Sequence, residues 1–259
     1  MMWTRDRELS EILDGNVAAF ERYRIRGTSV PLAGAQQMIV DTIERMERVS
    51  FGHTAVADAI LDLAVSRAGA RRPVRVLEVA AGNGWLTANL AGRAVRRGLE
   101  VDLTATDINV DLVDSMRERF EMDGVRATVR QADVSNLSEM GDGEVHVAVM
   151  SMCLHHLPAE IITASIRELH RVSAGGMVIH DLRRSLVSLL GLPPLAVAVA
   201  PMGGQGFALH DTAVSVRRAY TAGELEALLT EAGLGASYRV GRLPSRHPER
   251  WVTATVWPR

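Results

Sequence analysis

The sequence predicts an α/β fold whose parallel sheet is covered by helices on both faces. Beyond residue 72, short apolar runs alternate with amphipathic segments of helical period, and each period is typical of one kind of element. Strands that alternate with helices favour a parallel sheet, because parallel neighbours need a crossover connection. Two closely spaced strands near residue 250 indicate an antiparallel pair that closes the sheet.

The region ahead of residue 72 is expected to be helical. Its apolar residues recur at helical spacing in three segments, at 5–25, 36–49 and 55–68. Gly69 is a candidate C-cap of the third segment. We therefore divide the chain into an N-terminal helical cap, residues 1–71, and a main domain, residues 72–259. The cap helices are expected to complete a substrate pocket or a homodimer contact, with plain core packing as the alternative.

The main domain is expected to contain five buried parallel strands, at 74–79, 101–106, 127–130, 145–150 and 177–180. Four helices are expected between them, at 86–97, at 110–122, near Leu137 and at 159–171. Thr221 and Glu224 form a capping box for a further helix, which ends near Ala232. The antiparallel pair is expected at 236–240 and 251–256.

An apolar insertion at about residues 183–219 separates the fifth strand from this last helix. Residues 185–209 contain no charged side chain, but prolines and glycines interrupt them, so they lack the roughly 20 consecutive apolar residues of a membrane span. We expect no stable membrane insertion. Large apolar loops at the rim of a sheet commonly close a substrate pocket. Helix packing without ligand contact and peripheral membrane contact are the alternatives.

The composition narrows the classes of function. The formal net charge of -2 gives no electrostatic basis for a nucleic-acid partner. Cys153 is the single cysteine, which excludes a multi-cysteine zinc site and favours a reducing compartment. All 29 basic residues are arginines, which excludes chemistry that needs a lysine. Because the first residues also show no apolar targeting segment, we expect a cytoplasmic protein.

A loop of small residues follows the first strand and opens the next helix. Gly82 and Gly84 let the backbone approach a ligand without an intervening Cβ, and the free N–H groups of the following helix bind polar atoms. A tight strand-to-helix turn without a ligand is the alternative. Glu78 precedes the loop, where it orients the loop, binds an ammonium group or remains a solvated carboxylate.

Two further acids end the second and third strands. Asp107 is placed to accept hydrogen bonds from both hydroxyls of a ribose, with helix capping as the alternative. Asp133 is placed to accept a hydrogen bond from an exocyclic adenine amine, or to stabilise a turn. Because the carboxyl ends of parallel strands meet at one edge, Glu78, Asp107 and Asp133 together indicate a pocket for a nucleoside-bearing small molecule.

These residues resemble those of the class I S-adenosylmethionine-dependent methyltransferases. The matching runs are 78–84, 105–107, 131–133, 150–158 and 169–176. The resemblance is strong over residues 72–181 and weaker over 220–257, and it is closest in character to ubiquinone/menaquinone-type and secondary-metabolite enzymes. Ala80 stands where the family usually has its first glycine. Alanine is the smallest substitute, so the binding interpretation holds.

The resemblance implies a Rossmann-like sheet of seven strands, mostly parallel with an antiparallel terminal strand, and S-adenosylmethionine across its carboxyl edge. The cofactor-binding residues that it implies are Glu78, Ala80, Gly82, Gly84, Asp107, Ile108, Asp133, Val134 and Met150. An NAD(P)-dependent oxidoreductase is one alternative, although Thr87 stands where that fold packs a third glycine. A non-catalytic protein that binds the same cofactor is the other.

Methyl transfer needs an in-line nucleophile in a dry pocket and, for some acceptors, a base. Neutral imidazole titrates near working pH, and the candidate catalytic residues are His180, His210 and His155. The candidate substrate-binding residues are Met152, Arg183 and Phe207. His155 and His156 are adjacent and point in different directions, so we expect no metal site; structural packing is the alternative for His155.

The resemblance finally implies a small-molecule substrate. We expect an apolar or aromatic metabolite with an oxygen, nitrogen or carbon nucleophile, and no nucleic-acid substrate. The expected setting is secondary metabolism, such as the biosynthesis of an antibiotic. The acceptor and the general base stay open at this point.

Overall fold

The computed structural model describes residues 42, 45–46, 52–70, 72–200, 205–234, 237–241 and 250–257; for 52–55 and 205–207 it describes the backbone alone. The expected helix at 5–25 lies outside these residues, and that at 36–49 falls within them only at positions 42 and 45–46, which are helical. The third expected helix is α4, Gly52–Ala68. Gly69 follows it with a positive φ of 58°, as a C-terminal cap requires.

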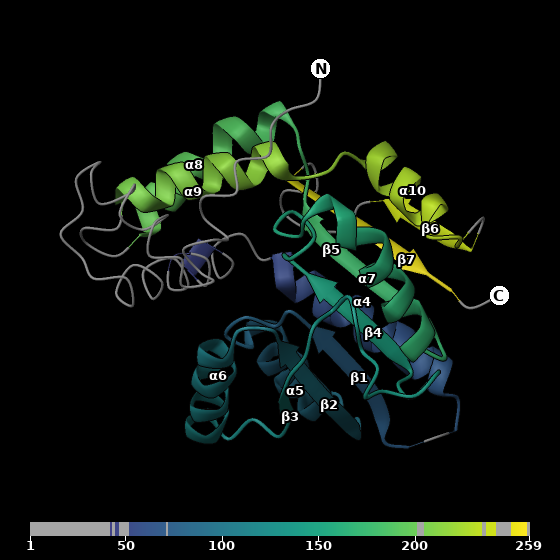
Figure 1. The fold of residues 1–259 in the computed structure, drawn as a ribbon. Helices are drawn as coiled ribbons and strands as arrows, with labels where there is room; N and C mark the ends of the chain where they lie inside the picture. Colours follow the sequence, from purple (N-terminus) through teal and green to yellow (C-terminus); the bar gives the residue numbers. More distant parts are fainter. Residues whose placement is uncertain are drawn as a thin grey trace.

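Seven strands of the described chain form one sheet, in the order β3-β2-β1-β4-β5-β7-β6 (Figure 1). The parallel strands are β1 Val74–Val79, β2 Val101–Asp107, β3 Thr128–Gln131, β4 Val147–Ser151 and β5 Met177–Leu182. The antiparallel strands are β6 Tyr238–Gly241 and β7 Trp251–Val256, with β7 paired to β5. The predicted mostly parallel sheet with an antiparallel terminal strand is confirmed.

Helices cover both faces of the sheet, as predicted. One face carries α4, α5 Trp85–Arg96 and α6 Val110–Asp123, and the other carries α7 Ala159–Val172 and α10 Ala222–Glu231 (Figure 1). The capping box of Thr221 and Glu224 opens α10. Because every crossover returns to the amino end of the next parallel strand, the carboxyl ends of β1, β2, β4 and β5 share one edge.

The core lies on the two faces of the central strands, whose side chains alternate between them. In β1, Leu77 packs with the α7 side, and Val76 packs with the α4 side. The inward face of α7 presents Ile162 and Ile166, both with no exposed surface. Full burial of an aliphatic side chain contributes about 1.5–3 kcal/mol relative to exposure. These contacts fix α7 against β4 and so position the loop between them.

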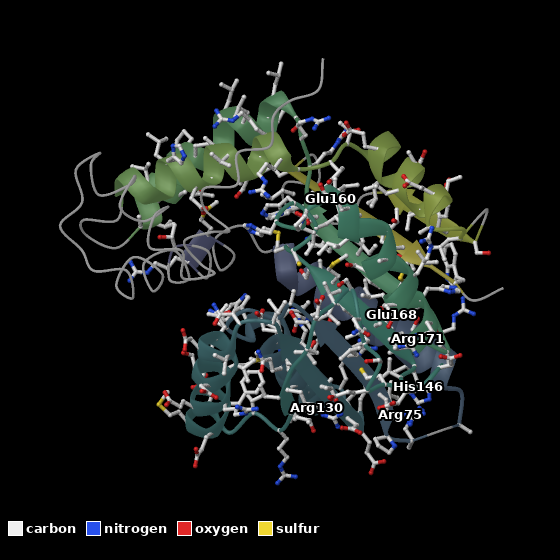
Figure 2. All side chains as sticks on the ribbon, viewed as in Figure 1. Arg75, Arg130, His146, Glu160, Glu168 and Arg171 are labelled. Carbon is white, nitrogen blue, oxygen red and sulfur yellow. The ribbon has the colours of Figure 1, made fainter. Side chains whose placement is uncertain are left out.

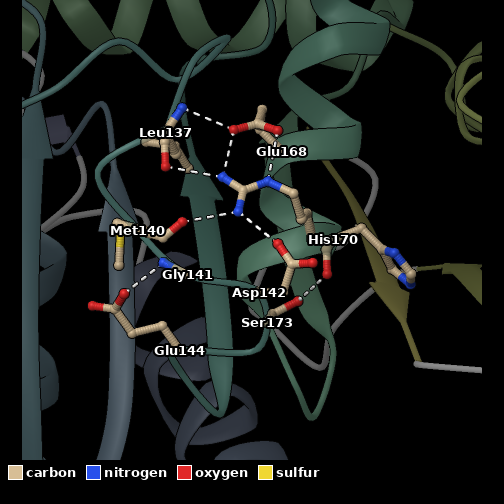
Figure 3. A network of polar contacts seen from close by, with 9 residues as sticks. Leu137, Met140, Gly141, Asp142, Glu144, Glu168, His170 and Ser173 are labelled. Carbon is tan, nitrogen blue, oxygen red and sulfur yellow. Dashed lines mark hydrogen bonds and ion pairs between the residues drawn. The ribbon is translucent and has the colours of Figure 1, made fainter.

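The expected short helix near Leu137 was wrong. Residues 133–140 form turns instead, and an isolated bridge joins Asp133 to Asn136. Arg171 of α7 makes five hydrogen bonds at this segment (Figure 3). Two go to the Leu137 and Met140 carbonyls of the segment, one goes to Asp142 just after it, and two go to the oxygens of Glu168 on α7. The guanidinium has five N–H donors. Its contacts therefore satisfy carbonyls that helical hydrogen bonds would otherwise have engaged.

The apolar insertion is helical where a loop was expected. It forms α8, Leu186–Val199, and α9, Gln205–Arg218, which pack against each other beyond the end of β5 (Figure 1). Ser185 caps α8 by accepting a hydrogen bond from the Ser188 N–H, and Pro193 and Pro194 lie inside the helix. Prolines usually interrupt helices, which is why the sequence favoured a loop. Within the described residues, the apolar helices fall short of what a membrane crossing requires.

We expect Arg171→Lys to destabilise the fold by about 1–3 kcal/mol, because a lysine leaves carbonyls and a carboxylate without their donors. Chemical denaturation measures the change. Arg130→Lys is the matched control, since Arg130 is exposed on β3 and outside this network (Figure 2). Equal stability of the two variants would contradict the assigned role of Arg171.

Candidate functional site

The loop after β1 runs through left-handed backbone conformations. Ala80, Gly82 and Gly84 have φ values of 50°, 57° and 75°. An L-residue in this region costs roughly 1–2 kcal/mol relative to glycine, which gives a physical reason for a glycine at position 80 in related loops. The Ala81 N–H donates to the Thr106 carbonyl at 2.8 Å. The loop is therefore held against the end of β2.

The two glycines of this loop have different surroundings. A Cβ on Gly82 would have no neighbour within 4 Å, whereas a Cβ on Gly84 would lie 2.5 Å from Cζ of Phe120 and 2.8 Å from Cγ of Met116. Gly82 therefore leaves space beside the loop, as the approach of a ligand requires. Gly84 lets α6 pack closely, a role that the sequence interpretation did not include.

Glu78 and Thr87 join the end of β1 to the first turn of α5. Oγ1 of Thr87 donates to Oε2 of Glu78 at 2.5 Å, and both side chains are buried. A hydrogen bond to a carboxylate in such surroundings is strong. Of the alternatives considered for Glu78, this contact favours orientation of the loop and its helix, and burial argues against a solvated carboxylate.

Asp107 lies beside the open glycine. Its Oδ2 accepts the Gly82 N–H at 2.8 Å, and its Oδ1 accepts the Asn109 N–H at 2.9 Å. Burial raises the pKa of this carboxyl, although these backbone N–H groups oppose the shift. The cap of α6 is Asn109, whose side chain accepts hydrogen bonds from two N–H groups. Asp107 is therefore not the helix cap, and its carboxylate retains acceptor capacity beyond its backbone hydrogen bonds.

The remaining predicted cofactor-binding residues fall into two groups. Ile108 is 57% exposed at the sheet edge, and the half-buried Asp133 accepts hydrogen bonds at Oδ1 from the N–H and hydroxyl of Ser135. The side chains of Val134 and Met150, in contrast, belong to the core beneath α7. A ligand at the edge would therefore meet the backbone of Val134 and Met150 rather than their side chains.

A cavity of about 70 Å³ lies past the ends of β4 and β5, under α8 and α9. Its lining residues are Met46, Met152, His155, His156, Leu182, Leu192, Asp211, Thr212, Ser215 and Trp251. Most of its wall is apolar. Met152 adopts a positive φ of 56° there, and backbone strain of this kind in a non-glycine residue is concentrated at functional sites.

A buried histidine–aspartate pair lies at this cavity: His155 lines it, and Asp181, which is not a lining residue, is bonded to His155. His155 Nδ1 lies 2.5 Å from Oδ1 of Asp181, and the His155 N–H donates to Oδ2 at 3.2 Å. Leu182 N–H also donates to Oδ1. The carboxylate therefore favours the tautomer with its proton on Nδ1, which leaves Nε2 as a proton acceptor.

Burial favours the neutral forms of two neighbouring groups, His156 and Cys153. Burial lowers the pKa of His156 well below its ordinary value, and His155 and Arg218 add to the effect. Burial also raises the pKa of the Cys153 thiol well above its ordinary value, so this cysteine is a poor nucleophile. Among the described residues, no group of three or more acids, histidines or cysteines is arranged to hold a metal ion.

Residues 76–176 match the family model described as a methyltransferase domain. Residues 76–176 therefore form a methyltransferase domain, and the sheet order agrees with the class I S-adenosylmethionine-dependent methyltransferase fold. This match favours methyl transfer over the oxidoreductase alternative. No curated protein sequence matches the chain.

Several solved structures share the fold of this methyltransferase. One is a methyltransferase from Aquifex aeolicus, with a TM-score of 0.54 and 18% identity over 77% of this chain and 88% of the other. The plantazolicin methyltransferase BamL has a TM-score of 0.57 and 13% identity, over 98% and 96% of the two chains. The CurJ carbon methyltransferase also has a TM-score of 0.57 and 13% identity, but its 94% coverage of this chain corresponds to 58% of the longer CurJ chain.

The residues at the sheet edge fit S-adenosylmethionine, the cofactor of this methyltransferase. Gly82 leaves open space beside the loop, the Asp107 carboxylate retains acceptor capacity, and Ile108 exposes an apolar surface next to it. An apolar group, a hydroxyl acceptor and an open backbone are what an adenosyl group requires.

The structure brings only one of the three candidate bases to the cavity. His155 lines it, whereas His180 packs against Trp251 with ring centroids 5.4 Å apart and Nδ1 2.9 Å from Oγ1 of Thr253. His210 lies half-buried on α9 and is not part of the cavity wall. Of the two aspartates that follow these histidines, Asp211 lines the cavity and Asp181 is bonded to His155.

The candidate substrate-binding residues are also divided. Met152 lines the cavity. Arg183 does not, and its N–H donates to the Arg250 carbonyl at 2.8 Å. The Phe207 side chain lies outside the described residues. Sequence reasoning missed Asp181, Asp211 and Trp251, and the only available signal was that each aspartate follows a histidine already under consideration.

We expect Gly84→Ala to destabilise the methyltransferase by about 1–3 kcal/mol more than Gly82→Ala, because only position 84 adds overpacking against Phe120. Both variants carry the same left-handed strain, so the comparison isolates the packing. Chemical denaturation of both proteins without cofactor measures the difference. Equal losses would contradict a packing role for Gly84.

We expect Asp107→Ala to weaken binding of S-adenosylhomocysteine about 10- to 100-fold, because hydrogen bonds to a charged group contribute about 1.5–3 kcal/mol. Titration calorimetry measures the affinity. Asp102→Ala is the matched control, since Asp102 is exposed near the start of the same strand. Unchanged affinity in Asp107→Ala would remove Asp107 from the cofactor site.

Proposed function

We propose that this methyltransferase transfers a methyl group to a small, apolar or aromatic metabolite after His155 removes a proton from it. The observation that carries the proposal is His155, which lines a cavity at the carboxyl edge of the sheet while its ring is bonded to the buried Asp181. Buried titratable pairs in clefts are common at catalytic sites.

The proposed cofactor site comprises the loop after β1 and the ends of β2 and β3. Asp107 accepts hydrogen bonds from the ribose hydroxyls, and Ile108 covers the adenine. Asp133 accepts a hydrogen bond from the adenine amine with Oδ2, because Ser135 bonds to Oδ1. Glu78 acts through Thr87 by fixing the start of α5. S-adenosylmethionine, when bound, supplies a methyl group already activated on a sulfonium.

The base is proposed to work through a fixed tautomer. Asp181 holds the Nδ1 proton, so Nε2 of His155 accepts the proton of the acceptor's O–H, N–H or acidic C–H. Asp181 then stabilises the imidazolium. The apolar walls formed by Leu182 and Leu192 exclude water from the nucleophile. The proton returns to solvent from His155 after methyl transfer.

Natural-product relatives support a role in secondary metabolism. BamL is described as a plantazolicin methyltransferase, and CurJ and DszA as carbon methyltransferases. Each shares the fold at 16% identity or less, so the setting rests on the analogy and on the apolar cavity together. A carbon nucleophile must lose a proton before methylation, whereas a thiolate has already lost it. A carbon acceptor therefore agrees with His155 as a base.

We also propose that the N-terminal segment completes the acceptor cavity. Met46 lines the cavity, and Nη1 of Arg45 donates to the Val199 carbonyl at the end of α8. This placement supports a cap function for residues 1–71. A homodimer, a cytoplasmic location and the absence of a nucleic-acid partner stay predictions from the sequence.

We expect His155→Gln to lower kcat about 10²- to 10⁴-fold, the usual contribution of a positioned general base. Release of S-adenosylhomocysteine is followed with a panel of phenols, aromatic amines and 1,3-dicarbonyl compounds. Asp181→Asn is expected to lower kcat as well, because it loses control of the tautomer. Affinity for S-adenosylhomocysteine, measured by calorimetry, is expected to stay unchanged in both variants.

His170→Gln is the control, because His170 lies near the C-terminal end of α7, away from the cavity. Full activity in His155→Gln on an acceptor that the wild type methylates would sink the proposed base. Cofactor binding without turnover of any acceptor class would favour the non-catalytic alternative.

A further inference from the structure

Asp211 is a buried carboxyl group without a hydrogen-bond partner for one oxygen. It lies on α9 with 8% of its surface exposed, and Oδ1 has no partner among the described residues. An unsatisfied polar atom in such surroundings is costly and rare in folded proteins. Because Asp211 lines the same cavity as His155, a bound molecule is the natural partner for this oxygen.

Trp251 supplies a second unsatisfied polar group to the cavity. It is 4% exposed at the start of β7, and its indole N–H has no acceptor within the part of the chain described. An indole N–H can only donate. Two elements distant in sequence, α9 and β7, thus each bring an unsatisfied polar atom to the cavity, whose apolar lining includes Met152, Leu182 and Leu192.

Burial favours the neutral form of Asp211, and the positively charged groups around it oppose this effect. Burial raises the pKa of Asp211 to about 6, against the opposing effects of His155 and Arg218. His156 lines the same cavity, and burial lowers its pKa well below the ordinary value. Helix α8 contributes no titratable side chain. Arg45 is bonded to the Val199 carbonyl at the far end of α8. A bound methyl acceptor that expels water from the cavity raises the pKa of Asp211 further.

We propose that Asp211 and Trp251 bind the oxygen of a carbonyl acceptor by donating to it, while His155 removes a proton from the adjacent carbon. This inference rests on the proposed function and names its substrate class, an enolisable carbonyl compound. A neutral carboxylic acid and an indole N–H together stabilise a developing oxyanion. An ionised Asp211 would instead repel the same charge.

The proposed reaction balances without a further reactant. His155 Nε2 takes the proton of the carbon next to the carbonyl, and the C–H electron pair becomes the enolate, whose oxygen Asp211 and Trp251 hold. The enolate carbon bonds to the methyl carbon as the methyl–sulfur bond breaks, and that electron pair stays on sulfur as S-adenosylhomocysteine. His155 then loses its proton to solvent.

The test uses 2,4-pentanedione as the probe with the full chain. Its KM is expected to rise about tenfold per pH unit above about pH 6, as the neutral form of Asp211 becomes scarce. Asp211→Asn keeps a donor that cannot titrate, so its KM is expected to stay low and flat with pH. Asp211→Ala is expected to raise KM 10- to 100-fold, and Trp251→Phe about fivefold, with unchanged affinity for S-adenosylhomocysteine.

A second readout needs no turnover. Ultraviolet difference spectra of the probe with the S-adenosylhomocysteine complex are expected to show enolate with wild type and Asp211→Asn, and none with Asp211→Ala. Asp114→Asn, on the exposed face of α6, is the matched control. A pH-independent KM in wild type, or methylation of phenols but not of the dicarbonyl, overturns this inference while leaving the His155 base intact. Failure of S-adenosylhomocysteine to bind overturns both proposals.

Discussion

The register between β4 and β5 is the constraint on which the candidate site depends. Ser151 pairs with His180, and the Met152 N–H donates to the His180 carbonyl at 2.8 Å. This last bond carries the chain past the end of β4 with Met152 in a left-handed conformation. His155 consequently turns over the end of β5, where Asp181 is the next residue. A shift of one residue would exchange the faces of His180 and Asp181 and separate the pair.

The buried aspartate is stable there because its hydrogen bonds replace water. A carboxylate without exposed surface is costly unless several donors meet it, and Asp181 receives the N–H groups of His155 and Leu182 in addition to the ring Nδ1–H. The same contacts orient the imidazole. The structure therefore uses one set of interactions to stabilise the charge and to fix the basic nitrogen.

The sequence predicted the sheet and the acids at its edge because both follow from local patterns. Apolar runs of strand length and helices bounded by glycine are recognised from a few consecutive residues. Strands β1, β2 and β3 each end in or near an acid. The sequence could not tell which member of the His180–Asp181 dipeptide contacts His155. That choice depends on strand register and on the path of the loop beyond β4, which are tertiary properties.

Two local patterns were misleading for physical reasons. The prolines of α8 suggested a loop, yet Leu192, Pro193 and Ala196 are buried and Ser185 caps the helix, so packing and capping offset the missing N–H groups. The segment near Leu137 had helical composition, but Arg171 offers its carbonyls donors from α7. Tertiary hydrogen bonds replaced the local ones.

The proposed cofactor site and the cavity depend on different elements. We call the pair of helices α8 and α9 the hairpin. Cofactor-site residues sit on β1, β2 and the loops directly attached to them, where both faces of the sheet are buried. The cavity instead depends on a small cluster that joins Leu182 and Trp251 of the sheet to Leu192 and Val216 of the hairpin. At about 70 Å³ the cavity admits only a few heavy atoms, so a larger acceptor must displace α8, α9 or Met46. If the proposed function holds, we expect acceptor specificity to depend on these elements, which lie apart from the proposed cofactor site.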